Sequence, residues 1–293
     1  MPRVVVVAGA TGALGARVAR AAAARGWRVR CFVRNPDRLD PALRASVRLG
    51  DALDVDLAID AMRGADAVFS AVGASALPAL GRGWRGYGAV DVAANRALIA
   101  AARAAGVGRF VYVSVQHPPA MRRLAYVAAH ERVVDELRAS PLAWAVVRPT
   151  GFFSAVGAYL ELARRGAIPE IGDGGARSNP IADDDLADVC VDALADGDPR
   201  LEIAAGGPDV LTRRAIGQLA FAALGAPPRF RHVPVGVARI GAALLRPFHP
   251  RLAQLTAFVA GLGAHDVVAP VRGRRRLADH FAAIAAAPAA AAA

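Results

Sequence analysis

The chain of 293 residues contains no lysine, so all 36 of its basic residues are arginine. Any mechanism that needs a lysine Schiff base, a lysine general base or a phosphate-binding lysine is therefore excluded. A proton donor or a cation in a functional site must be supplied by another residue type.

Cysteines and long apolar runs are also scarce. The two cysteines, Cys31 and Cys190, both lie in apolar segments, which favours buried thiols over a disulfide. No apolar run reaches the roughly 18 residues needed to cross a membrane. The four valines near the N-terminus form too short a run for a secretory signal. The sequence therefore predicts a cytoplasmic protein without a membrane span.

The formal net charge of +11 is typical of nucleic-acid-binding proteins, but its distribution is not. The arginines are scattered among aspartates, and only residues 272–276 are densely basic. No aromatic residues are interleaved with them and no DNA-binding motif is present. We therefore expect no nucleic-acid partner.

No metal site is predicted either. Asp183, Asp184 and Asp185 resemble a metal-binding cluster, but they open a predicted helix, where acids are stabilised by the helix dipole. The histidines outside the segment 117–130 are scattered and lack zinc-ligand spacing.

Strands and helices alternate over the first half of the chain. Apolar runs predict strands at 3–9, 28–34, 47–51, 66–73, 109–115 and 143–153, with helices between them that include 91–106 and 131–140. This alternation is typical of an α/β fold with a doubly wound parallel sheet, similar to a Rossmann fold.

The regular alternation of strands and helices ends after residue 153, and helices are predicted at 211–225 and over 237–263. We expect three parts: a nucleotide-binding domain over 1–153, a smaller, mostly helical substrate lobe over 154–280, and a low-complexity tail over 281–293.

Three glycines join the first strand to the first helix. Gly9 permits a sharp turn, Gly12 leaves room for a pyrophosphate at the backbone, and Gly15 lets the helix pack closely on the strand. The helix N-terminus, with Ala13 and Leu14, supplies N–H donors, and Thr11 adds a hydroxyl. The turn predicts dinucleotide binding, and the alternative is a merely tight strand-to-helix connection.

The end of the second strand bears on the choice of dinucleotide. NAD-binding sites usually carry an acid there, but this strand ends in Arg34. A guanidinium at that position binds a 2′-phosphate through paired charged hydrogen bonds. NADP(H) is therefore the expected cofactor and NAD(H) remains possible, with a solvated strand-end arginine as the alternative interpretation.

The segments "AGATGALG", "FVRNP", "RFVYVSV", "VVRPTGFF" and "NPIADDDLA" together resemble the atypical short-chain dehydrogenase/reductase superfamily, in its NmrA-like NAD(P)-binding branch. The resemblance covers about residues 3–210. It implies that Asp51 lies near the adenine and Asn95 on the central helix. It also implies that two segments line the dinucleotide: Ala71, Val72 and Gly73, and, beside the nicotinamide, Pro149, Thr150, Gly151 and Phe152.

The superfamily's working set is a serine, a tyrosine and a lysine four residues after the tyrosine. Here Ser114 ends the fifth strand, Tyr126 follows twelve residues later, and His130 stands in the place of the lysine. Tyr126 and His130 would share one helix face. Either His130 supports Tyr126 as the proton donor of a modified reductase, or the tyrosine mechanism has been lost.

Substrate contacts are expected from Gln116 and His117, which follow the fifth strand, and from Phe153 in the wall of the cleft. The sequence predicts an NADPH-dependent oxidoreductase that acts on a small, largely apolar carbonyl, quinone or conjugated alkene. The alternative is an NADP(H)-binding redox sensor or assembly protein without turnover.

Overall fold

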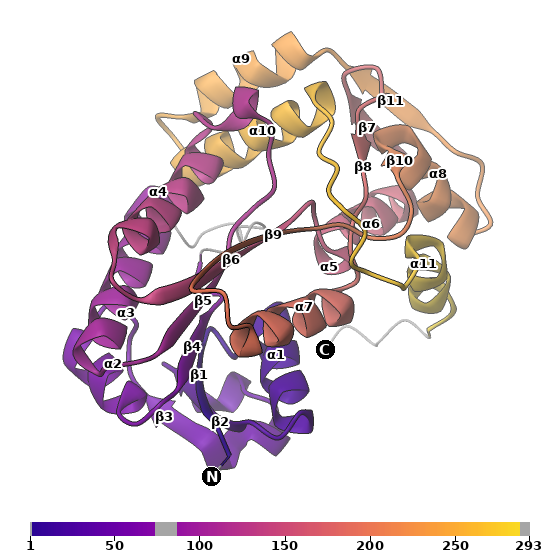
Figure 1. Cartoon of the computed structure of the whole chain (residues 1–293). Coiled ribbons are helices and arrows are strands. Elements are labelled where there is room, and N and C mark those ends of the chain that lie inside the picture. Colours follow the sequence, from indigo (N-terminus) through magenta and orange to yellow (C-terminus); the bar gives the residue numbers. More distant parts are fainter. Residues whose placement is uncertain (1, 74–86, 288–293) are drawn as a thin grey trace.

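The computed structural model describes residues 2–73 and 87–287. Its centre is a parallel sheet of seven strands, which confirms the predicted doubly wound α/β fold (Figure 1). The strand order is β3-β2-β1-β4-β5-β6-β9. The strands are β1 (Val4–Ala8), β2 (Arg28–Val33), β3 (Val47–Leu49), β4 (Ala67–Ser70), β5 (Arg109–Val113), β6 (Ala143–Pro149) and β9 (Arg200–Ala205).

Helices cover both faces of this sheet because the central strands are apolar on both sides. Val5 and Val7 pack in one core cluster, and Val6 and Ala8 pack in a second one on the opposite face. The first face is covered by α1 (Ala13–Ala24) and α7 (Asp183–Ala195). The second is covered by α2 (Val55–Met62), α3 (Ala93–Ala104) and α4 (Ala125–Ala139).

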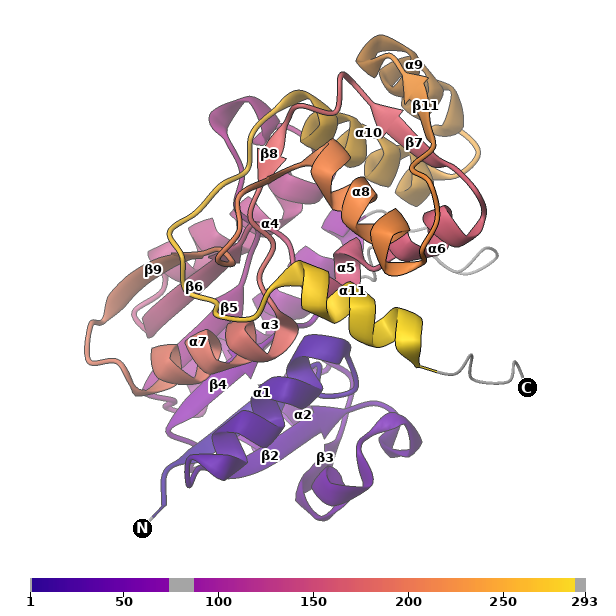
Figure 2. The ribbon, with the colours of Figure 1, turned by 90° about the vertical axis from the view of Figure 1, so that its right-hand side faces the viewer.

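The chain after β6 builds a further unit with its own apolar core, around Phe153, Phe221 and Phe281. Its helices are α5 (Phe153–Val156), α6 (Ala158–Arg164), α8 (Arg213–Ala223), α9 (Val235–Leu245), α10 (Pro250–Ala264) and α11 (Leu277–Ala286). Its short strands pair as β7 (Ile168–Ile171) with β11 (Phe230–Val233), and β8 (Arg177–Ser178) with β10 (Leu211–Thr212). Figure 2 shows α8, α9 and α10 at the end of the molecule remote from β3.

Several predicted boundaries were wrong. The strand expected over 143–153 ends at Pro149, because Gly151 takes a φ of +142° and the helix α5 begins at residue 153. The helix expected from residue 131 begins at Ala125. No side chain caps its N-terminus, so the sequence carries no start signal there.

A helix also extends past residue 281, the predicted start of the low-complexity tail. The helix α11 continues to Ala286 and buries Phe281 completely. Cys31 and Cys190 are buried free thiols, as expected.

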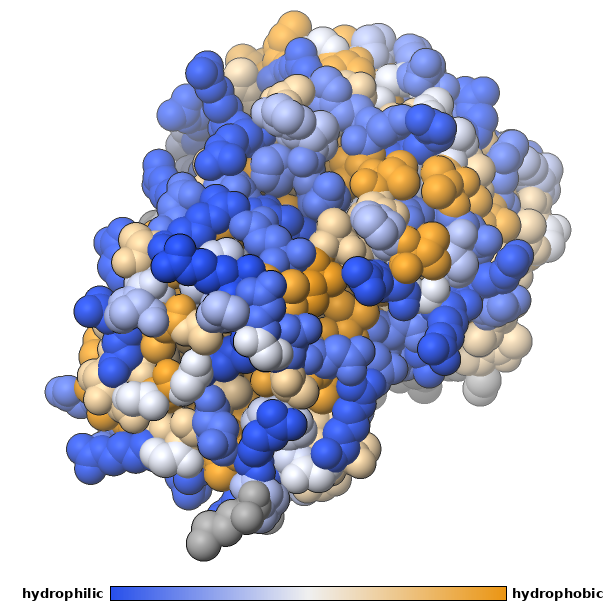
Figure 3. All heavy atoms as spheres, in the orientation of Figure 1, coloured by the Kyte–Doolittle hydropathy of each residue, from blue (hydrophilic) through white to orange (hydrophobic). Residues whose placement is uncertain are grey.

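Within the described residues, no helix is long and apolar enough to cross a membrane. Hydrophilic and hydrophobic side chains alternate over the face of the molecule seen in Figure 3.

Candidate functional site

The glycine turn lies at the point where the strand order reverses, between β1 and its neighbour β4. Open parallel sheets bind ligands at such a switch point, outside the carboxyl ends of the strands. Gly9 has a φ of +88°, and a Cβ there would lie 3.0 Å from the backbone of Ala71. A Cβ on Gly15 would lie 2.1 Å from the carbonyl oxygen of Gly9. Two of the three glycines are therefore required by the turn itself.

Gly12 is different, because the fold does not require a glycine there. Its φ of −86° and ψ of 162° suit any residue, and a Cβ would meet only the Gly9 carbonyl oxygen, at 3.3 Å. Gly12 and Ala13 are exposed, Thr11 is half-buried, and Leu14 points into the core. No side chain caps the N-terminus of α1, so its first amides are available to an anion. This cradle fits the pyrophosphate of a dinucleotide.

Arg34 follows β2 at the same edge of the sheet. Its side chain is 77% exposed, and its Nη1 lies 3.8 Å from Oδ2 of Asp51, which follows β3. The structure thus brings together the two residues that were predicted to surround the adenosine end. The contact is loose and solvated, so Arg34 is free to turn toward a phosphate.

The segment after β4 is fixed by a buried asparagine on α3. Asn95 accepts a hydrogen bond from the Ser70 hydroxyl at 2.6 Å and donates to the Val72 carbonyl at 2.9 Å. Ala71 donates its amide to the carbonyl of Ala8 on β1 at 3.1 Å. Asn95 therefore acts on this segment by positioning its backbone next to the glycine turn. Gly73, where the described part of this segment ends, is exposed, and a Cβ on it would lie 3.4 Å from an Asp91 carboxylate oxygen.

The loop after β6 is held against the segment 178–182. The Thr150 hydroxyl donates to the Asn179 carbonyl at 2.7 Å, and Phe152 pairs with Ile181. Pro149 and Thr150 are buried, whereas Gly151 and Phe152 are partly exposed. Phe153, expected at the substrate, is only 2% exposed and packs in the core of the C-terminal unit. The structure therefore gives Phe153 a packing role.

Tyr126 lies in the first turn of α4 within an aromatic cluster. Its ring is edge-on to Tyr87 and to His130, with centroids 4.9 Å and 4.8 Å away, and Phe258 of α10 lies at 4.6 Å. Its hydroxyl makes no hydrogen bond to any residue in the ranges 2–73 and 87–287. Burial, with a contribution from nearby Asp91, raises the pKa of Tyr126 above its usual value. Tyr126 is therefore a protonated phenol at neutral pH.

His130 does not reproduce the superfamily's lysine. A hydrogen bond of 2.7 Å joins its Nδ1 to the hydroxyl of Tyr112 on β5. Burial lowers the pKa of His130 to about 4, so the imidazole is neutral at physiological pH. A neutral ring supplies no positive charge to Tyr126, which agrees with the raised pKa of that tyrosine.

The structure shows a buried ion pair beside the aromatic cluster that the sequence analysis did not predict. Glu131 of α4 binds Arg148 of β6, and their side chains are 6% and 11% exposed. Nη1 of Arg148 also lies 3.5 Å from the Ser114 hydroxyl, and Nε2 of His117 lies 3.4 Å from Oε1 of Glu131. A lone arginine inside an otherwise apolar strand was the available signal, since unpaired charges are almost never buried. Ser114 and His117 thus meet in one network, while Gln116 bonds the backbone of Pro149 at 2.9 Å.

The Glu131 network predicts a specific acid sensitivity. Burial alone would raise the pKa of Glu131, but hydrogen bonds from His117 and Arg148 outweigh it and lower the pKa from 4.5 to about 2. A depressed carboxyl pKa contributes stability above pH 4.5, and this stability is lost as the pH falls toward 2. We expect a contribution of about 3 kcal/mol to the free energy of unfolding.

Denaturant unfolding of the Glu131→Gln variant between pH 7 and pH 2 measures this contribution. The difference from the unmodified protein should be largest at neutral pH and shrink as the pH approaches 2. Glu161→Gln, at a 60% exposed side chain, is the matched control and should change stability by less than about 0.5 kcal/mol. An equal effect at both ends of the pH range would contradict the assignment.

The three aspartates at the start of α7 form hydrogen bonds and ion pairs with segments distant in the sequence. Asp183 accepts from the amide and hydroxyl of Ser154, Asp184 pairs with Arg17 at 3.0 Å, and Asp185 binds the backbone amides of Arg274 and Arg275. Each lies in the first turn of the helix, as predicted. Among the residues with described positions, no group of side chains is arranged to hold a metal ion.

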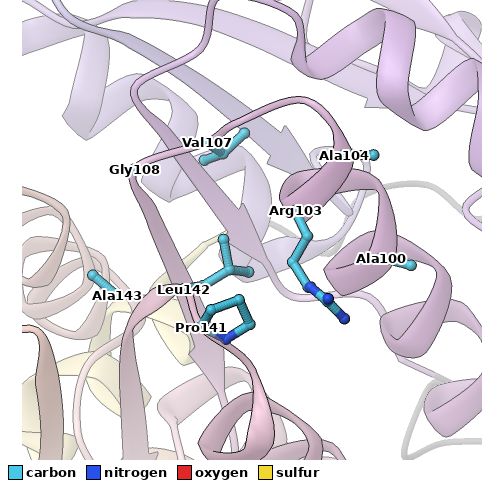
Figure 4. A pocket seen from close by; sticks show the side chains of 8 residues that line it. All are labelled: Ala100, Arg103, Ala104, Val107, Gly108, Pro141, Leu142 and Ala143. Atoms are coloured by element: carbon cyan, nitrogen blue, oxygen red, sulfur yellow. The ribbon is translucent and has the colours of Figure 1, made fainter.

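One surface pocket lies far from these residues. It is lined by the C-terminal end of α3 and by the segments that lead into β5 and β6, including Arg103, Val107 and Pro141 (Figure 4). This is the amino edge of the sheet, opposite the glycine turn and Ser114. It is therefore no candidate for the dinucleotide cleft.

The fold and the glycine turn define a dinucleotide-binding protein of the Rossmann type, and comparison with known families agrees. Residues 9–197 match the model of the NAD(P)H-binding family. The chain belongs to this family, which confirms the NAD(P)-binding part of the predicted resemblance.

Two curated relatives are enzymes. A divinyl chlorophyllide a 8-vinyl-reductase of Zea mays is 31% identical over 251 residues, which cover 80% of this chain and 62% of the relative. This chain thus spans less than two thirds of the length of that protein. A (4-alkanoyl-5-oxo-2,5-dihydrofuran-3-yl)methyl phosphate reductase of Streptomyces griseus is 30% identical over 256 residues, which cover 85% of this chain and 83% of the relative.

Solved structures show the same fold over nearly the whole chain. A nucleoside-diphosphate-sugar epimerase of Staphylococcus aureus has a TM-score of 0.75 at 17% identity, covering 96% of this chain and 99% of its own. An NADPH-dependent quinone oxidoreductase of Escherichia coli, solved with NADPH, has a TM-score of 0.69 at 19% identity, with the same coverage.

Proposed function

We propose that this protein is an NADPH-dependent reductase of a small, largely apolar substrate, in particular a conjugated alkene or a quinone. The observation that carries the proposal is the glycine turn at the switch point, with an uncapped helix N-terminus behind an exposed Gly12. NADPH bound there would supply a hydride. The NAD(P)H-binding family and the reductases among its relatives support this class of reaction.

The environment of Tyr126 supports the choice of substrate. In a reductase with the full set, the lysine lowers the pKa of the tyrosine and makes it a better acid. Here the lysine is absent, His130 is neutral, and the pKa of Tyr126 is raised. Hydride addition to a conjugated alkene or a quinone gives a delocalised anion, which needs less help from an acid than the alkoxide formed from a simple ketone. The vinyl group, dihydrofuranone and quinone in the names of the relatives are in line with this argument.

We assign Tyr126 as the proton donor, because its hydroxyl is protonated and unbonded to the described residues. Ser114, fixed at the end of β5, would contact a polar atom of the substrate, and Arg148 holds that serine. His117 and Gln116 would lie beside the nicotinamide ring, and the loop from Pro149 to Phe152 would pack against it. His130, which is hydrogen-bonded to the Tyr112 hydroxyl, contacts the ring of Tyr126 edge-on and positions it.

The second candidate is an NADP(H)-binding sensor without turnover. The neutral His130 beside Tyr126 favours it, because an activated tyrosine is then missing. The two functions share the cofactor site and differ only in chemistry. A screen of NADPH oxidation, followed at the absorbance of the reduced nicotinamide, against quinones, enones, vinyl arenes and simple ketones separates them. Tight NADPH binding without oxidation by any of these classes would favour the sensor.

Arg34 should set the preference for NADPH over NADH. A charged contact to the 2′-phosphate is worth about 1.5–3 kcal/mol, so Arg34→Ala should weaken NADPH binding by about 10- to 150-fold. NADH binding should change little, because NADH lacks that phosphate. Isothermal titration with both cofactors measures this split.

Arg63→Ala, at a 73% exposed arginine just after α2 and remote from the turn, is the matched control and should leave both affinities unchanged. Equal affinities of the unmodified protein for NADPH and NADH would remove the basis for assigning Arg34 this role.

A further inference from the structure

The C-terminal unit contains a long segment of one charge sign. Between Asp209 and Asp266 the chain has seven arginines and no acidic residue. Arg213 is partly buried, and Arg214 pairs with Glu170. Four others are exposed and form no ion pair with any described residue: Arg229, Arg231, Arg239 and Arg246. This end of the molecule therefore carries an uncompensated positive charge.

The same segment presents an apolar stripe to solvent. Val237, Ile240 and Leu244 of α9 recur at helical spacing and are 57%, 62% and 69% exposed. Phe248, just after the helix, is 71% exposed. We call these four residues the α9 face. They are among the most exposed large apolar side chains of the described chain, and three of them lie on one helix.

Arginines border the α9 face on one side. Arg239 and Arg246 are seven residues apart, so they share a helix side between the exposed stripe and the buried residues Ala238 and Ala242. Hydrophobic atoms with hydrophilic neighbours are visible at the top of the molecule in Figure 3, where Figure 1 places α9. An apolar stripe with bordering arginines is typical of a helix that lies in the interface of a lipid bilayer.

We propose that the α9 face docks the protein on an anionic lipid surface. Ile240, Leu244 and Phe248 would enter the boundary between headgroups and acyl chains, and Arg239 and Arg246 would reach the phosphates. A second copy of this chain is a poorer occupant. A symmetric contact would oppose two α9 faces, each with the same arginines and no acid to pair with them.

The position of α9 gives this docking a consequence for the candidate site. The outer helix α9 packs on α10, and α10 packs on α4. Through α10, Phe258 contacts Tyr126, and Gln254 accepts a hydrogen bond from the backbone of Tyr87 at 3.1 Å. Docking would therefore place the aromatic cluster one helix layer from the lipid, which suits an apolar substrate. The docking itself does not depend on turnover.

Sedimentation of the full chain with vesicles tests the proposal. Vesicles of equal parts phosphatidylserine and phosphatidylcholine should bind the protein, and pure phosphatidylcholine should bind it far more weakly. The double variant Ile240→Ser/Leu244→Ser should lose about a hundredfold in affinity for the anionic vesicles. Arg239→Ser/Arg246→Ser should lose about thirtyfold, and high salt should reduce the binding of the unmodified protein.

The matched control is Leu53→Ser/Leu57→Ser, at exposed leucines on the nucleotide side of the molecule, and it should bind like the unmodified protein. Two results would overturn the proposal. One is binding that is absent, or equal on both kinds of vesicle. The other is a dimer in lipid-free solution that Ile240→Ser/Leu244→Ser converts to monomer, since the α9 face would then be an interface between copies.

Discussion

Replacing Gly12 by valine should abolish NADPH binding and leave the protein folded. The backbone at Gly12 has an extended conformation that valine adopts readily, and a Cβ there would have one close contact, at 3.3 Å. The added side chain would instead occupy the space above the first amides of α1, where the pyrophosphate must approach. Loss of these charge-assisted hydrogen bonds should weaken binding by at least about a hundredfold.

Titration with NADPH, together with circular dichroism and thermal unfolding, measures both halves of this prediction. Gly15→Ala is the informative contrast, because its Cβ would lie 2.1 Å from the Gly9 carbonyl oxygen. That variant should lower the melting temperature, whereas Gly12→Val should not. Normal NADPH affinity in a folded Gly12→Val protein would show that the turn is only a tight connection between β1 and α1.

Replacing Tyr126 by phenylalanine should lower kcat by about 10²-fold, the lower end of the usual contribution of a general acid, because a delocalised anion needs less help from an acid than an alkoxide. The Kd for NADPH should change by less than about twofold, because the change removes only a hydroxyl that bonds no described residue. Since the pKa of Tyr126 is raised above 10, the hydroxyl remains protonated as the pH rises. The reduction rate should therefore show no decline from tyrosine ionisation up to about pH 10.

Single-turnover kinetics with a substrate found in the oxidation screen measures the rate. Tyr159→Phe, on α6 and outside the aromatic cluster, is the matched control and should leave kcat unchanged. An unchanged rate in Tyr126→Phe would mean that the proton comes from solvent. The reductase proposal would survive that result, but the role of Tyr126 would not.

The sequence alone could predict the parts of the site that depend on local structure. The four valines followed by spaced glycines indicated the strand, the turn and the helix, because each of these steps is encoded within a few residues. The spacing of Tyr126 and His130 placed them on one helix face for the same reason. Family resemblance implied only that Asn95 lies on the central helix, and the structure adds its partners in the segment after β4, the Ser70 hydroxyl and the Val72 carbonyl.

What the sequence could not predict depends on contacts between distant segments. The ion pair of Glu131 and Arg148 forms only when α4 packs beside β6, and Phe258 reaches Tyr126 from a helix more than a hundred residues away. His130 is neutral because it is buried, and the spacing of residues in the sequence does not reveal burial. Short strands such as β7 and β11 exist only through their mutual pairing, so neither carries a strong pattern of its own.

The most direct test of the reductase is transfer of deuterium from NADPH labelled at C4 of the nicotinamide. The reaction would be run with a conjugated alkene from the oxidation screen, because hydrogen delivered to a quinone ends on oxygen and exchanges with water. The product would be analysed by mass spectrometry for deuterium at a carbon that does not exchange. A reductase that binds NADPH at the glycine turn should give one deuterium per alkene product, from one face of the nicotinamide only, and none with Gly12→Val. NADPH that binds tightly but transfers no deuterium to any conjugated alkene would contradict the proposed reduction of this substrate class.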